Sequence, residues 1–233
     1  MITIYPYSKL GRANYEWIDA RHHFSFANYY NPNRMKFGVL RVINDDIIKP
    51  QSGFDMHPHK NMEIITYVRS GAITHKDNKG NEGRIEAGDI QVMSAGSGII
   101  HSEYNLEDND TNLYQIWIKP NKINVEPRWD SKVFPKEVLT DSLPLLVSGN
   151  NDAPLFIYQD IEIYGGKLKK NTIISHPIKR QAYLLVSQGK ISLEGQVIKR
   201  GDGVEITNLP HIKIQTIDDS EILILDVPDS SVN

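Results

Sequence analysis

The chain has 233 residues, of which 39% are hydrophobic and 24% charged, and its formal net charge is −3. It contains no cysteine, which excludes disulfides, thiolate nucleophiles, zinc fingers and iron–sulfur clusters, so that any metal must be held by nitrogen and oxygen. The charge offers no basic field for direct nucleic-acid binding, and no apolar run reaches the roughly 18 residues of a membrane span. Residues 1–7 lack the basic and apolar regions of a signal peptide, which predicts a cytoplasmic protein.

Short segments rich in Val, Ile, Tyr and Phe recur along the chain between Gly, Asn and Asp turn signals. Their spacing predicts an all-β protein of the sandwich or barrel type with few short helices, the clearest helix candidate lying near residues 15–20. The sequence Asn-Lys-Gly-Asn at 78–81 predicts a hairpin turn. The predicted strands are 37–43, 63–68, 89–93 and 113–118, followed by 181–186, 190–193 and 221–227.

Five prolines mark a change of composition in the middle of the chain, between Pro120 and Pro154. Because proline interrupts long strands, we expect a first domain over residues 1–120, a linker region over 121–154 and a second domain over 155–233, with exchange of strands between the two allowed.

A weak internal repeat spans this boundary. Aligning Gly71 with Gly189 also aligns Glu-Ala-Gly-Asp at 86–89 with Lys-Arg-Gly-Asp at 199–202. Both halves therefore resemble one strand-turn-strand design used twice.

Two short segments carry potential metal ligands at strand spacing. His57, His59 and Glu63 have the same parity, and would point to one side of an unbulged strand. His101 and Glu103 repeat the i, i+2 spacing. Three neutral imidazoles and a carboxylate suit Fe(II), Ni(II), Co(II), Mn(II), Cu(II) or Zn(II), among which the sequence does not choose.

The pattern His-x-His-x3-Glu followed by Gly-x2-His-x3-Asn resembles the two motifs of the cupin superfamily. Residues 57–59, 94–98 and 101–103 resemble the pirin family in particular, as do residues 17–32 and 40–46. The resemblance implies two cupin-type β-barrels in one chain, a bicupin, with one divalent transition metal, Fe(II) first among the candidates, in the N-terminal barrel. It implies His57, His59, His101 and Glu103 as ligands, and leaves Glu63 to support the site.

The repeat places no ligand in the second barrel. His57, His59 and Glu63 align with Ser175, Pro177 and Gln181, while His101 and Glu103 align with Ile214 and Thr216. His176 is one residue out of register, on the opposite strand face. The second barrel is therefore expected to be structural or to form a partner surface.

Other polar and aromatic residues have a simpler interpretation. We expect His22 and His23 to pack structurally, since at most one of two adjacent residues could face the metal. His75, beside the predicted turn, is expected to be exposed to solvent, and Asn105 is left unassigned. The apolar residues Phe54, Ile65, Met93 and Trp117 could line an aromatic pocket or belong to the barrel core.

The resemblance implies a pirin-like oxidoreductase that opens a flavonol such as quercetin with O2, with Glu103 or Glu63 accepting the substrate's proton. The alternative is a non-enzymatic, metal- or redox-sensing protein that binds a protein partner. A third is another small-molecule cupin enzyme such as an isomerase, because cupin folds host many chemistries. We expect a monomer, since no long unpaired apolar segment indicates an interface.

Overall fold

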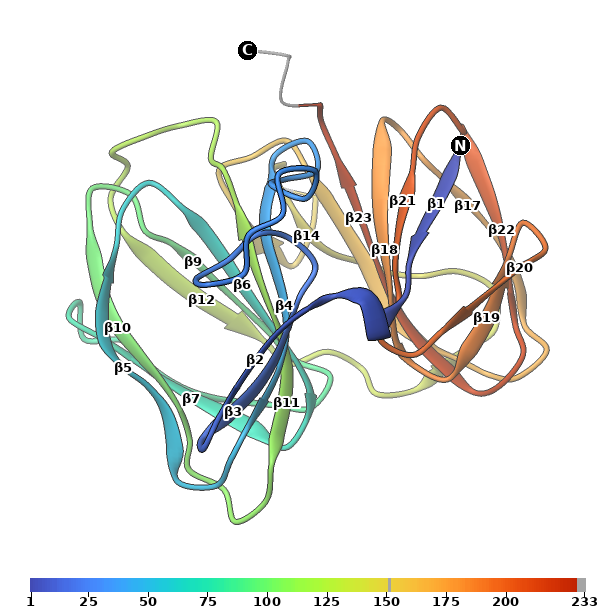
Figure 1. Ribbon diagram of the computed structural model, residues 1–233. Helices are drawn as coiled ribbons and strands as arrows, with labels where there is room; N and C mark the ends of the chain where they lie inside the picture. The colour runs from blue at the N-terminus through green and yellow to red at the C-terminus, as the bar shows by residue number, and fades with distance from the viewer. Residues whose placement is uncertain (151, 230–233) are drawn as a thin grey trace.

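The structure, a computed structural model, describes residues 1–150 and 152–229. Two β-barrels lie side by side, and the N-terminal barrel is built from blue to green strands in Figure 1. The all-β prediction is confirmed, and the only helical element of the described residues is one 3-10 turn, η1 (Tyr7–Lys9). None of the helical structure in these residues is long and apolar enough to cross a membrane.

The N-terminal barrel consists of a seven-stranded sheet and a four-stranded sheet. In spatial order the larger sheet holds β12 (Arg128–Lys132), β9 (Ile90–Ser94), β6 (Glu63–Ser70), β11 (Thr111–Ile118), β4 (Leu40–Ile48), β3 (Ile18–His22) and β2 (Gly11–Tyr15). The smaller sheet holds β5 (Ser52–His59), β10 (Ile99–Asn105), β7 (Ala72–Asp77) and β8 (Glu82–Glu86).

The C-terminal barrel repeats this plan with an eight-stranded and a four-stranded sheet. The larger sheet holds β1 (Ile2–Tyr5), β21 (Gly203–Ile206), β18 (Gln181–Gln188), β23 (Ser220–Val227), β16 (Glu162–Leu168), β14 (Leu145–Ser148) and β15 (Leu155–Phe156), with β13 (Val138–Leu139) beside β16. The smaller sheet holds β17 (Ile173–Pro177), β22 (His211–Thr216), β19 (Lys190–Leu193) and β20 (Gln196–Lys199).

Two strands join a barrel from outside the chain segment that builds most of it. The first strand of the chain, β1, pairs with β21 and so belongs to the C-terminal barrel, where it appears in dark blue among red strands (Figure 1). After β11 the chain contributes one more strand, β12, to the N-terminal barrel by pairing with β9. Each barrel therefore contains strands from outside the segment that supplies most of it.

The two larger sheets face each other and share one core. On β18, Tyr183 and Leu185 belong to this shared core, whereas Leu184 and Val186 fill the interior of the C-terminal barrel. Both faces of the strand are thus buried, which explains why its sequence is a nearly continuous apolar run rather than an alternating one. Burial of each such side chain contributes about 1.5–3 kcal/mol, so the contact between the barrels is a major stabilising feature.

The interiors of the two barrels differ in chemistry. The C-terminal barrel is filled with buried aliphatic side chains, among them Ile214, which aligns with His101 in the repeat. The N-terminal barrel keeps buried polar groups in its interior, including Glu103, Gln91 and Thr66. The internal repeat is visible in the backbone, because Gly71 and Gly189 both adopt positive φ angles, of 75° and 79°.

Two local predictions have opposite outcomes. Residues 78–81 connect β7 to β8 and make the predicted hairpin turn. The helix predicted near residues 15–20 is wrong: this segment ends β2, turns at residues 16–17 and begins β3. Backbone pairing of β3 with β4 explains the difference, since tertiary contacts override weak local helix propensity.

Candidate metal centre

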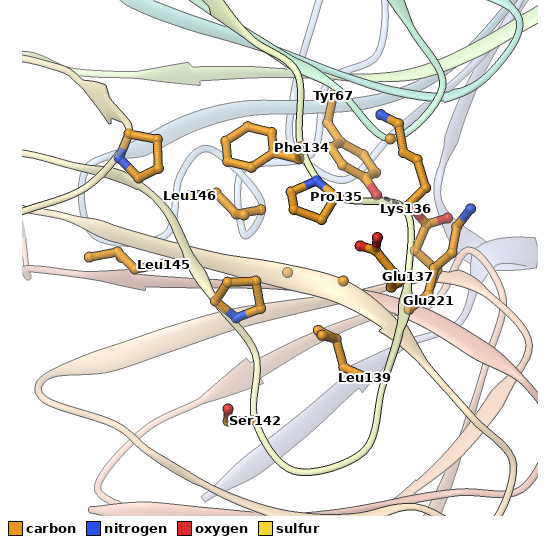
Figure 2. A pocket seen from close by; sticks show the side chains of 16 residues that line it. Tyr67, Phe134, Pro135, Lys136, Glu137, Leu139, Ser142, Leu145, Leu146 and Glu221 are labelled. Atoms are coloured by element: carbon orange, nitrogen blue, oxygen red, sulfur yellow. Dashed lines mark hydrogen bonds between the residues drawn. The ribbon is translucent and has the colours of Figure 1, made fainter.

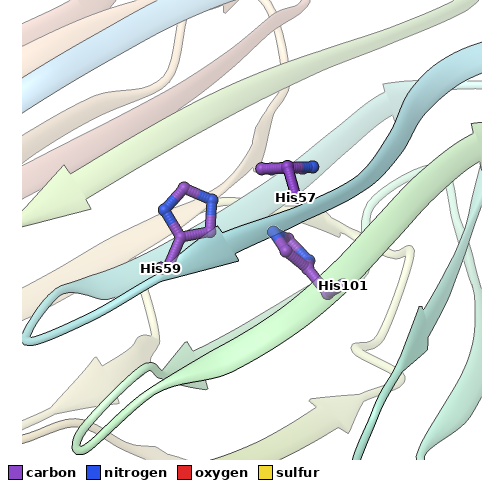
Figure 3. A group of neighbouring side chains, drawn as sticks. All are labelled: His57, His59 and His101. Carbon is purple, nitrogen blue, oxygen red and sulfur yellow. The ribbon is translucent and has the colours of Figure 1, made fainter.

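Three histidines from two paired strands meet at one end of the N-terminal barrel. His57 and His59 lie on β5 and His101 on β10, and the pairing sets His101 directly opposite His57. Their rings point toward one another (Figure 3), and one ring nitrogen of each lies within 4.8 Å of the others. This is close enough for small side-chain rotations to bring all three onto one ion.

A β-bulge shapes the strand that carries two of these histidines. The pairing with β10 runs from His101 opposite His57 to Glu103 opposite Phe54, so β5 has one extra residue over this interval. The bulge reverses the alternation of side chains, and Phe54 consequently lines the same cavity as His57 despite the odd spacing between them. The cavity has a volume of about 150 Å³.

Burial of His59 and His101 favours their neutral imidazole forms. Burial, followed by the nearby His57 and His75, lowers the pKa of His101 to about 3, and burial followed by His101 and His57 lowers that of His59 to about 4. The Nε2 atom of His101 is buried and has no hydrogen-bond partner within the described residues. A buried nitrogen lone pair without a partner fits a metal ligand.

Hydrogen bonds to the other ring nitrogens fix how two of these rings are held. His57 Nδ1 lies 2.6 Å from the carbonyl oxygen of Asp55, to which it donates, so Nε2 is left for a ligand bond. His101 Nδ1 lies 3.4 Å from Nδ1 of His75, and His75 Nε2 lies 3.1 Å from Asp77 Oδ2. The His101 ring is therefore held by the imidazole of His75, which is held in turn by the carboxylate of Asp77.

His75 itself is fully buried, so the prediction that it is exposed to solvent is wrong. It lies on β7 between β8 and β10, and its ring stacks on Trp129 at a centroid distance of 5.0 Å and an angle of 11°. Although burial opposes the shift, hydrogen bonds from Asn81 and His75 lower the pKa of Asp77. The carboxylate form of Asp77 is thus maintained behind the histidine pair.

Glu103 lines the same cavity as the three histidines, although it is not one of the three groups within 4.8 Å. Its carboxylate accepts hydrogen bonds from Thr66 Oγ1 at 2.9 Å, from Gln115 Nε2 at 2.6 Å and from Gln91 Nε2. These three donors come from β6, β11 and β9, which hold the carboxylate in a fixed place. Gln91 in turn accepts a hydrogen bond from Trp129 Nε1. The Trp129 indole therefore contacts both His75, by stacking, and Gln91, which bonds Glu103.

Glu63 does not line this cavity, contrary to the prediction from its parity with His57 and His59. The strand β5 ends at His59, the chain reverses over residues 60–62, and Glu63 begins β6 in the other sheet. Its carboxylate accepts hydrogen bonds from Ser94 Oγ at 2.7 Å and from the backbone N–H of Tyr158 at 3.2 Å. Burial raises the pKa of Glu63 while the hydrogen bond from Ser94 opposes this.

The remaining sequence candidates fall into two groups. Trp117 and Phe54 line the cavity, with the Trp117 ring edge-on to His59 at 4.9 Å, whereas Ile65 and Met93 are core residues. His22 and His23 are buried and pack as expected, the first against Asn44 and the second against Tyr183. Asn105 has a structural role, since its amide bonds the carbonyl oxygens of Ile48 and Asn109.

Sequence reasoning missed several residues that complete the cavity. Asp46 and Gln115 line it, and Asp46 Oδ1 is buried without a hydrogen-bond partner in the part of the chain that the structure describes. Burial, with Asp45 and Glu103 nearby, raises the pKa of Asp46 well above its usual value. The available signals were the polar run 44–46 inside β4 and Gln115 inside β11, because polar residues within a buried strand indicate hydrogen-bonding groups.

Comparison with known proteins agrees with this geometry. A family profile described as Pirin matches residues 5–118, and one described as the quercetinase C-terminal cupin domain matches residues 145–227. A putative quercetin 2,3-dioxygenase of Zymomonas mobilis is 48% identical over 97% of each chain. The chain belongs to the pirin family. Both of its barrels are accordingly cupin barrels, as predicted.

Two further comparisons of this pirin are with Escherichia coli sequences and structures. A quercetin 2,3-dioxygenase is 41% identical, covering 98% of this chain and 99% of its own. The crystal structure of the bacterial pirin YhhW in complex with nickel(II) has a TM-score of 0.92 and 41% identity, with 98% of this chain and 100% of that chain covered. The similarity thus extends over both barrels, and the three-histidine group fits a single transition metal ion.

Proposed function

We propose that this pirin is a metal-dependent oxidoreductase that opens the heterocycle of a flavonol such as quercetin with O2. The observation that carries the proposal is the convergence of three imidazoles, two of which burial keeps neutral, and one buried carboxylate on a cavity with aromatic walls. The names of the relatives from Zymomonas mobilis and Escherichia coli support the same substrate class. The proposal places this activity in the cytoplasm and in a monomeric chain.

Each residue of the cavity has a proposed part in binding or proton transfer. His57, His59 and His101 would hold one divalent metal through neutral nitrogens, with Fe(II) first among Ni(II), Co(II), Mn(II), Cu(II) and Zn(II), and we propose Glu103 as the fourth ligand. A metal bound there would supply Lewis acidity toward the substrate's oxygen atoms and a binding position for O2.

Glu103 is also the proposed acceptor of the proton from the flavonol's 3-hydroxyl. It lines the cavity, whereas the carboxylate of Glu63 bonds Ser94 and Tyr158 elsewhere. The bonds from Thr66, Gln91 and Gln115 orient the Glu103 carboxylate before the substrate arrives, so no reorganisation is required during proton transfer. General base catalysis of this kind contributes typically about 100- to 10,000-fold to rate.

Cavity size limits how a flavonol would be held. The volume of about 150 Å³ is smaller than the roughly 300–1,000 Å³ of sites that enclose a whole drug-sized ligand. We therefore propose that only the hydroxy-ketone end of the flavonol enters, between Phe54 and Trp117, while the rest lies toward solvent. His57 and His59 are only half-buried, which is consistent with access from outside.

The decisive experiment loads the full chain anaerobically with Fe(II), Ni(II), Co(II), Mn(II) or Cu(II), then measures bound metal and O2 consumption with quercetin. The matched controls are His59→Ala and a flavone that lacks the 3-hydroxyl. Turnover that requires metal, His59 and the 3-hydroxyl supports the dioxygenase. One metal per chain without turnover would contradict it and favour the alternative, a metal- or redox-sensing protein that binds a protein partner.

A further inference from the structure

A second cavity lies between the two barrels, away from the three histidines. Its volume is about 380 Å³, and it shares no lining residue with the histidine cavity. One side is formed by β6 of the N-terminal barrel and the other by β14, β16 and β23 of the C-terminal barrel. The chain segment 133–144 passes over it, as Figure 2 shows.

The walls of this cavity are mainly apolar. Phe134 and Leu146 lie near each other in Figure 2, and Leu139, Leu145 and several prolines also line the cavity. On β16, a Cβ atom added at Gly166 would lie 2.7 Å from Cδ1 of Leu139, so the lack of a side chain there leaves room beneath the overlying segment. The volume lies within the roughly 300–1,000 Å³ typical of small-molecule sites.

One end of the cavity is polar and connects the two barrels. Tyr67 of β6 donates a hydrogen bond from its hydroxyl to the carboxylate of Glu221 on β23, and Ser187 Oγ donates to the other carboxylate oxygen at 3.2 Å. Both Tyr67 and Glu221 are only 4% exposed. The hydroxyl proton of Tyr67 is already donated to Glu221. The lone pairs that remain on these two residues can therefore only accept hydrogen bonds from a bound molecule.

The buried charge at this end disfavours anionic ligands. A carboxylate or phosphate would meet the buried Glu221 carboxylate, and like charges in a poorly solvated site repel strongly. Three more charged residues line the cavity: Lys136, which is paired with Asp89, and the less buried Glu137 and Lys167. Glu221 is therefore the buried charge at the polar end. A head group that donates hydrogen bonds is complementary to Glu221 whether it is neutral or cationic.

We propose that the cavity between the barrels binds a small aromatic molecule with a hydrogen-bond-donating, uncharged or cationic head group, such as a phenol or an aryl-alkyl ammonium. Its ring would lie against the apolar wall formed by Phe134, Leu139 and Leu146, and its head group against Glu221. This site is independent of the metal and of the proposed dioxygenase activity.

Three probes that share one ring system test the proposal: 2-naphthol, 2-naphthylmethylamine and 2-naphthoate. Each is titrated into the full-length, Zn(II)-loaded protein, with binding followed by amide chemical shifts. The phenol and the amine are expected to bind at least about tenfold more tightly than the carboxylate, with shifts at Tyr67, Phe134 and Leu139. Equal affinity for the carboxylate, or shifts confined to residues around His101, would overturn the proposal.

Two variants and a control separate this site from the metal cavity. Leu139→Trp places an indole in the cavity from the overlying segment, and should weaken phenol and amine binding by at least about tenfold. Glu221→Gln should remove the preference for the amine over the carboxylate, since it deletes the charge and keeps a similar shape. Phe54→Leu alters only the histidine cavity and should leave all three affinities unchanged. Unchanged binding in Leu139→Trp would contradict the assignment of the site.

Discussion

His75 lies directly behind His101, with the two Nδ1 atoms 3.4 Å apart, and its other ring nitrogen contacts Asp77. If His101 binds a metal through Nε2, its Nδ1–H can donate to His75, which can donate in turn to Asp77. This order of donors fixes the tautomers of both rings and raises the basicity of the ligand nitrogen.

Replacement of His75 by Phe should therefore weaken metal binding by about 10- to 100-fold, as loss of such supporting groups commonly does. The phenyl ring retains the stacking on Trp129 and removes only the hydrogen bonds. Metal competition titrations measure the affinity, and the Cu(II) electron paramagnetic resonance spectrum reports the changed ligand field. His211→Asn, at an exposed histidine of the other barrel, is the control, and equal affinity in both variants would show that His75 does not support the site.

Removal of a histidine ligand should abolish metal binding without unfolding the second barrel. We expect His57→Ala and His101→Ala to retain no stoichiometric metal after gel filtration, because each variant removes one of the four proposed ligands and opens the site to water. The C-terminal barrel has its own aliphatic core, so circular dichroism should show retained β-structure. His176→Ala, which alters a buried histidine in that second barrel, should keep one metal per chain. Full metal retention in the first two variants would disprove the site.

The two glutamates should respond differently to neutralisation. Glu103→Gln is expected to reduce quercetin turnover by at least about 100-fold, because it removes the proposed proton acceptor and disturbs three hydrogen bonds. Glu63→Gln should leave turnover nearly unchanged and lower the free energy of unfolding by about 1 kcal/mol through its contacts with Ser94 and Tyr158. Steady-state kinetics and urea unfolding of both variants measure this contrast, and the reverse pattern would assign the catalytic role to Glu63.

The strands and the shared face of His57 and His59 follow from local sequence rules, whereas His101 was joined to them through the resemblance to the cupin motifs. Segments rich in Val, Ile, Tyr and Phe, separated by turn signals such as Gly71 and Gly88, both at positive φ, predict the strands. The His-x-His spacing puts both rings on one strand face because the bulge in β5 lies before His57 and not between the two histidines. These features depend on neighbours within a few residues, which is why they could be predicted.

The errors arise where distant segments decide the outcome. Glu63 has the parity of His57, but a chain reversal at residues 60–62 separates them, and parity carries no information across a turn. His75 was expected to be exposed beside a hairpin, whereas pairing of β7 with β10 buries it. Its spacing of two from the fully buried Ile73 was the available signal. The cavity between the barrels depends on packing of two domains, which no local pattern encodes.

His23 predicts a specific pH dependence of stability. It is fully buried between the barrels, with Nδ1 3.0 Å from the hydroxyl of Tyr183. Burial, followed by the charges of Arg34 and Arg69, lowers its pKa to about 3. An unfolded-state pKa near 6.5 means that below pH 6.5 the unfolded chain takes up a proton that the folded chain does not. The contribution of His23 to the free energy of unfolding is therefore fully present above pH 6.5 and is lost progressively as the pH falls toward 3.

The matched variant is His23→Phe, which retains a ring against Tyr183 and cannot titrate. Between pH 6.5 and 4.5 the free energy of unfolding of the parent should fall more steeply than that of the variant, by about 1 kcal/mol per pH unit. Urea unfolding at several pH values measures the two slopes, and His211→Asn serves as an exposed control with the parent's slope. Other buried histidines contribute equally to parent and variant, so the difference isolates His23. Parallel slopes would mean that His23 becomes protonated in the folded protein, and hence that water reaches the contact between the barrels.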